Sequence, residues 1–100
     1  MMSEELAAAE EARQLIDTLS PISPDTPTIV ETLRRAYDQA RRALPLTLSS
    51  DEALNTIRKD VILALNDVVN SLQARTLTQE KIDNAKKLGE AWIMLLKRKN

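Results

Sequence analysis

The sequence predicts an all-α protein, a compact bundle of about four helices that forms one domain over residues 1–100. Apolar residues recur every three or four positions through most of the chain, which is the period of an amphipathic helix. Only one Gly and four Pro interrupt the chain, so long stretches contain no helix breaker. Phe is absent and the aromatic share is 2 %, so the core must consist of Leu, Ile, Val and Ala, which suits the packing of helix against helix.

The first helix is predicted over residues 3–20. Ser3 is a suitable N-cap, and Pro21 disfavours helical geometry in the residue before it. The apolar face is rich in Ala, which allows a neighbouring helix to approach closely; its members are Leu6, Ala9, Ala12, Leu15, Ile16 and Leu19. The prolines Pro21, Pro24 and Pro27 follow at intervals of three residues and predict a stiff, extended connection.

The second helix is predicted over residues 27–44. Thr26 and Pro27 fit the N-cap and the first helical position, although Thr28 with Glu31 also matches a capping box and would start the helix slightly later. Pro45 is expected to end the helix. Its apolar face is continuous and consists of Ile29, Val30, Leu33, Ala36, Tyr37, Ala40, Ala43 and Leu44.

The third helix is predicted over residues 50–75, behind a capping box formed by Ser49 and Glu52. Its apolar arc is wider than that of a surface helix, so we expect it to contact at least two other helices. The arc is built on Leu54, Ile57, Val61, Leu65, Val68 and Leu72. Arg58 lies beside this arc and is expected to lay its aliphatic stem on apolar surface while its guanidinium stays in water.

The fourth helix is predicted over residues 78–98, with Thr78 as its cap and Leu77 packed against Ile82. The link before it is so short that the third and fourth helices must be antiparallel neighbours. The simplest architecture is therefore an up-down-up-down antiparallel bundle. In that arrangement the acidic first helix would lie beside the basic fourth helix.

The composition argues against several classes of function. Cys and His are both absent, which removes thiolate catalysis, the commonest general base and the commonest transition-metal ligands, so we expect no enzyme and no cofactor. The net charge of −1 predicts no affinity for nucleic acid. No apolar run is long enough to span a membrane, and the acidic first residues do not resemble a signal peptide, so a cytoplasmic protein is expected.

A few residues could carry binding. Gly89 lies on the inner stripe of the fourth helix, where glycine costs about 1 kcal/mol relative to alanine. We expect a close approach of helices to offset that cost; a small pocket beside Trp92, able to take the apolar group of a small molecule, is the alternative.

Five residues are candidates for an interaction surface. Tyr37 and Trp92 are the only aromatic residues and are expected to be core anchors, with a partly exposed contact site as the alternative. Leu46, Leu63 and Met94 are apolar residues that the helical pattern does not clearly bury. Together they could mark a surface for a protein partner or a homodimer.

In composition and style the chain resembles computationally designed helical bundles, with no Cys, no His, explicit caps and an aliphatic core. It differs from them because no Gly follows the end of a helix. The resemblance implies a stand-alone structural bundle that exists only as a recombinant protein. The alternative is a small natural interaction module, such as a bacterial or phage regulator, that binds a protein partner or self-associates through a helix face.

Overall fold

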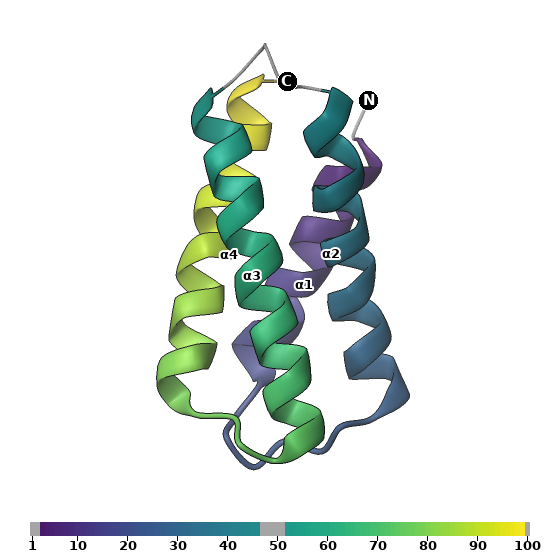
Figure 1. The fold of residues 1–100 in the computed structure, drawn as a ribbon, viewed down its shortest axis with the longest axis vertical. Helices are drawn as coiled ribbons and strands as arrows, with labels where there is room; N and C mark the ends of the chain where they lie inside the picture. The colour runs from purple at the N-terminus through teal and green to yellow at the C-terminus, as the bar shows by residue number, and fades with distance from the viewer. Residues whose placement is uncertain (1–2, 47–51, 100) are drawn as a thin grey trace.

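The structure is a computed structural model that describes residues 3–46 and 52–99. Over these ranges the chain forms four helices and no strand: α1 (Glu4–Thr18), α2 (Pro27–Leu46), α3 (Glu52–Ala74) and α4 (Gln79–Lys99). Successive helices run in alternating directions along the long axis of the molecule (Figure 1). The predicted all-α four-helix bundle is confirmed.

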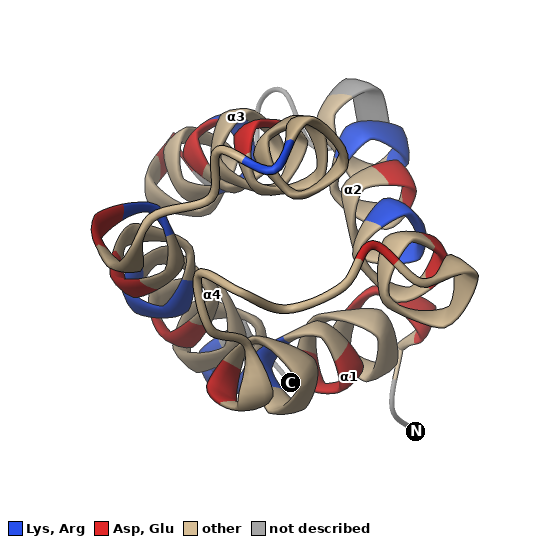
Figure 2. Ribbon diagram, turned by 90° about the horizontal axis from the view of Figure 1, so that it is seen from below, with Lys and Arg blue, Asp and Glu red and all other residues tan. Residues whose placement is uncertain are grey.

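The helices form a ring around one core. α1 packs against α2 and α4, and α3 packs against the same two helices, so α1 and α3 face each other across the diagonal (Figure 2). The prediction that the third helix contacts at least two others is therefore confirmed. The largest fully buried side chains come from all four helices: Ile16, Leu33, Leu54, Val61, Val68 and Trp92.

Three of the predicted N-caps are present. The side-chain oxygens of Ser3, Thr26 and Thr78 accept a hydrogen bond from the backbone N–H three residues on, at 3.1, 3.4 and 3.3 Å. These bonds satisfy backbone donors that the first turn of a helix leaves without a partner. Ser49 lies outside the described residues, and with it the predicted capping box to Glu52.

Each helix begins and ends within two residues of the predicted position. α2 continues two residues beyond its predicted end and runs to Leu46. Pro45, which was expected to follow this helix, instead lies inside its last turn. A proline there removes one backbone hydrogen bond only, because so little helix follows it.

α3 ends in a Schellman motif without glycine. The Thr76 N–H donates to the Ser71 carbonyl at 2.8 Å, and the Arg75 N–H donates to the Leu72 carbonyl at 3.3 Å. This pattern requires a left-handed residue, and Arg75 supplies it with φ 61°. A residue with a Cβ is strained by about 1 kcal/mol or more in that conformation, so Arg75 stands where glycine would be most favourable.

Candidate functional site

A buried charged cluster joins three helices near the start of α1. Arg58 of α3 donates from Nε to Glu5 Oε2 and from Nη2 to Glu5 Oε1, both at 2.7 Å. The indole N–H of Trp92, on α4, donates to Glu5 Oε2 at 2.8 Å. Arg58 Nη1 also donates to Asn55 Oδ1 at 3.2 Å. We refer to Glu5, Asn55, Arg58 and Trp92 as the core polar cluster.

The position of Arg58 corrects the expectation that its guanidinium lies in water. The side chain is 4 % exposed, and its partner Glu5 is 11 % exposed. The head group of Arg58 meets a carboxylate from α1, because the long arginine side chain spans the diagonal that separates the two helices.

The geometry of the core polar cluster suits positioning rather than reaction. The guanidinium binds both oxygens of Glu5, and this two-point contact fixes the orientation of both groups. Among the described residues, no buried side-chain nitrogen or oxygen lacks a hydrogen-bond partner. A buried ion pair adds little net stability, but separating its two members is strongly unfavourable. The cluster therefore penalises any packing that moves α1 away from α3 and α4.

The predicted interaction residues have very different environments. Trp92 is 1 % exposed, so it is a core anchor and not part of an exposed contact surface. Tyr37 is half-buried. Leu63 and Met94 are 69 % and 59 % exposed. Leu46 ends α2, but its side chain lies outside what the structure describes.

These residues do not line one common surface depression. Tyr37 lines a shallow depression between α2 and α3, together with Val69. Leu63 lines a groove between α3 and α4, together with the half-buried Leu88. Met94 belongs to α4 and lines neither of the two.

Gly89 does not mark a close approach of helices, which corrects the sequence-based expectation. A Cβ added to Gly89 would meet no atom of the other described helices within 4 Å. The space beside it is a void of about 10 Å³ that is also lined by Ala12 and Trp92. One water molecule needs about that volume, so the void has no room for the apolar group of a ligand.

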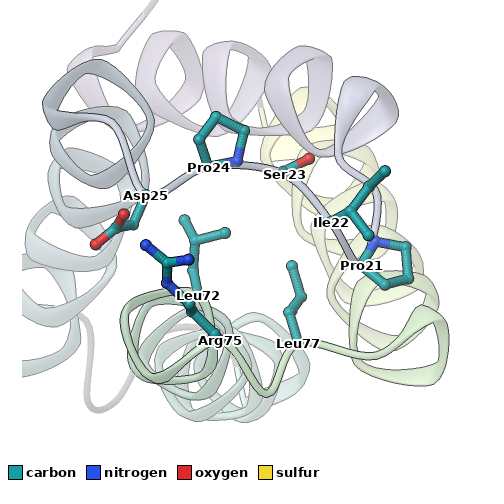
Figure 3. A pocket seen from close by; sticks show the side chains of 8 residues that line it. All are labelled: Pro21, Ile22, Ser23, Pro24, Asp25, Leu72, Arg75 and Leu77. Atoms are coloured by element: carbon teal, nitrogen blue, oxygen red, sulfur yellow. The ribbon is translucent and has the colours of Figure 1, made fainter.

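A larger pocket lies at the end of the bundle where the α1–α2 and α3–α4 connections meet (Figure 3). Its volume is about 400 Å³, and Pro21 and Pro24 form one wall while Leu72 and Leu77 lie opposite. Arg75, which has the left-handed backbone conformation, lies on the side of Leu72 and extends across toward the α1–α2 loop (Figure 3). The pocket is open to solvent, and its lining mixes apolar with charged side chains.

The described ranges contain neither a cluster of metal-binding side chains nor a membrane-spanning helix. No group of three or more acidic side chains there is arranged to hold a metal ion. Within residues 3–46 and 52–99, none of the helices combines the length and the apolarity needed to cross a membrane.

The fold and the core polar cluster define a four-helix bundle whose buried charges bind one another. The sequence matches no protein-family model, and neither the curated proteins nor the solved structures include a match to it.

Proposed function

We propose that this chain is a stand-alone structural bundle, whose role is to hold a stable helical fold and not to catalyse a reaction. The observation that supports the proposal is the core polar cluster. The Glu5 carboxylate accepts hydrogen bonds from the Arg58 guanidinium and from the Trp92 indole N–H, and these contacts link α1, α3 and α4. Charged groups that bind each other between helices in this way hold the helices in their relative positions.

The resemblance to designed bundles agrees with this proposal. Capped helices around one aliphatic core are the devices that give such proteins high stability. We therefore expect a chain that is monomeric at micromolar concentration and unusually resistant to heat.

A thermal melt followed by circular dichroism, combined with light scattering on a sizing column, tests this proposal. The expected result is a reversible, cooperative melt above about 90 °C by a protein with the mass of one chain. A melting temperature that rises with protein concentration, together with the mass of a dimer at micromolar concentration, would contradict a stand-alone bundle.

A second candidate function is that of a protein-interaction module. It is favoured by the exposure of Leu63 and Met94 on the outer sides of α3 and α4. If a partner or a second copy covers these side chains, Leu63→Glu or Met94→Glu should abolish the association in light scattering without changing the helical content. Association that survives both substitutions would exclude this surface.

A further inference from the structure

Arg75 has a backbone conformation that glycine would adopt at lower cost. Its φ is 61°, in the left-handed region, and it lies just after the end of α3. Residues other than glycine are strained in this region, and strained residues cluster at ligand clamps and other functional sites. The strain at Arg75 therefore indicates a role for its side chain.

The Arg75 side chain has no protein partner in the described ranges. It is exposed, and within residues 3–46 and 52–99 its guanidinium forms no hydrogen bond and no ion pair. By contrast, Arg35 and Arg58 are each paired with a carboxylate of α1. The Arg75 guanidinium instead extends across toward the α1–α2 loop (Figure 3). Its N–H donors are therefore available to a bound molecule.

Apolar surface lies next to this guanidinium, in the pocket of about 400 Å³ that we call the end pocket. Pro21 and Pro24 lie on one side of it, and Leu72 and Leu77 lie opposite (Figure 3). Ile22 also lines the end pocket and is 92 % exposed. Small-molecule sites have volumes of about 300–1,000 Å³. The end pocket therefore has the size and the surface to take one compact apolar group beside a charged group.

Both sides of the end pocket are held by local hydrogen bonds. The Ser20 N–H donates to Ser23 Oγ at 2.8 Å, and the Ser23 N–H donates to the Ser20 carbonyl at 3.0 Å. The nearby prolines restrict the rest of this loop. On the other side, the Thr76 N–H donates to the Ser71 carbonyl at 2.8 Å and closes the turn that carries Arg75. A preformed site of this kind loses little conformational freedom when a ligand binds.

We propose that the end pocket binds a small monocarboxylate that carries one apolar group, such as an arylalkanoate. The carboxylate binds Arg75, because a guanidinium donates two parallel hydrogen bonds to such a group, and the apolar group lies between the proline and leucine walls. Arg75 balances one negative charge, and Asp25, which also lines the pocket, repels a second, so a monocarboxylate is favoured over a phosphate monoester. This binding goes beyond the proposed structural role, since the bundle folds without a ligand.

The test is a titration of the ¹⁵N-labelled full chain with sodium 3-phenylpropanoate, followed by two-dimensional NMR. We expect saturable shifts of the amide signals of Ser23, Arg75 and Leu77, with a dissociation constant on the order of 1 mM for a ligand of this size. The uncharged analogue 3-phenylpropanamide should bind about tenfold more weakly. The proposal is overturned if the shifts do not saturate, if the amide binds as tightly as the carboxylate, or if phenyl phosphate binds more tightly than either.

Two substitutions of Arg75 separate binding from stability. Arg75→Gly removes the guanidinium and relieves the backbone strain, so the fold is kept while the affinity for 3-phenylpropanoate falls about tenfold. Arg75→Gln keeps the strained backbone but loses the charge, and it should bind as weakly as Arg75→Gly. Arg42→Gln is the matched control, because Arg42 is exposed on α2 and does not line the end pocket. Unchanged affinity in either folded Arg75 variant, or an equal loss of affinity in the control, overturns the proposal.

Discussion

Removal of the Glu5 carboxylate tests the role of the core polar cluster most directly. In Glu5→Ala the two 2.7 Å hydrogen bonds from Arg58 and the 2.8 Å bond from the Trp92 indole are lost together. Arg58 keeps its bond to Asn55 and its other contacts, but its charge loses this carboxylate at a site where the side chain is 4 % exposed. Breaking a buried ion pair in this way costs 3–5 kcal/mol as a rule, and because Glu5 retains some contact with solvent we expect about 3 kcal/mol.

The free energy of unfolding is measured by urea titration, followed by circular dichroism and by the fluorescence of Trp92, the only tryptophan. Glu4→Ala is the matched control, because Glu4 is exposed in the same first turn and has the same favourable position relative to the helix dipole. We expect that control to cost less than about 1 kcal/mol. If Glu5→Ala costs no more than Glu4→Ala, the cluster does not hold the helices together and the reasoning is refuted.

A double variant distinguishes a lost partner from a lost interaction. In Glu5→Leu/Arg58→Leu both charges are replaced by apolar groups, so neither of these two is left buried without the other. We expect this variant to recover most of the stability that Glu5→Ala loses and to lie within about 2 kcal/mol of the natural chain. A double variant as unstable as Glu5→Ala would show that the ion pair itself, and not the buried charge, sets the cost.

Three further substitutions test other parts of the structure by urea titration. Arg75→Gly should stabilise the bundle by about 0.5–1 kcal/mol, because glycine relieves the strain at φ 61°; a loss of stability would mean that the arginine side chain makes a more valuable contact. Gly89→Ala should also stabilise, by about 1 kcal/mol, since the added methyl meets open space and alanine favours helix; destabilisation would contradict the open geometry. Leu65→Ala should cost about 2–5 kcal/mol at a site 3 % exposed, whereas Leu63→Ala should change stability by less than about 0.5 kcal/mol; equal effects would place Leu63 in an interface.

The helices could be predicted from the sequence because their signals are local. Ser3, Thr26 and Thr78 are capping residues that act within one turn, and the aliphatic residues recur at the helical period. The short link after α3 likewise fixed α4 beside it. Arg75 could not be assigned a left-handed conformation, since the sequence offered no glycine to mark the position.

The core polar cluster was missed because its partners are far apart in the chain. Arg58 and Glu5 are separated by 53 positions and lie on helices that are not neighbours. A signal was nevertheless present. Arg58 lies between Leu54 and Val61 on the apolar arc of α3. Glu5 lies one helical turn before Ala9 on the inner face of α1. An acid and a base that both fall on inward-facing positions of one bundle are expected to meet, because neither can be buried alone.

The environment of Gly89 could not be predicted for a different reason. The sequence shows that a glycine is present on the inner stripe, but the distance between helices depends on the largest side chains nearby. Trp92 lies three positions further along α4 and lines the same void. The space beside a glycine depends on the packing of several residues, so the spacing of small residues along the sequence could not predict it.

The contact between Glu5 and Trp92 also has a consequence for the order of folding. It closes a loop of 87 residues, whereas the contact between Ser71 and Lys81 across the α3–α4 turn closes one of 10. The difference in loop-closure entropy amounts to about 2 kcal/mol, so the longer loop is expected to close last. Most contacts of a helical bundle are local and form quickly. In a refolding experiment the helical signal should therefore develop first, and the fluorescence of Trp92 should report the final arrival of α1.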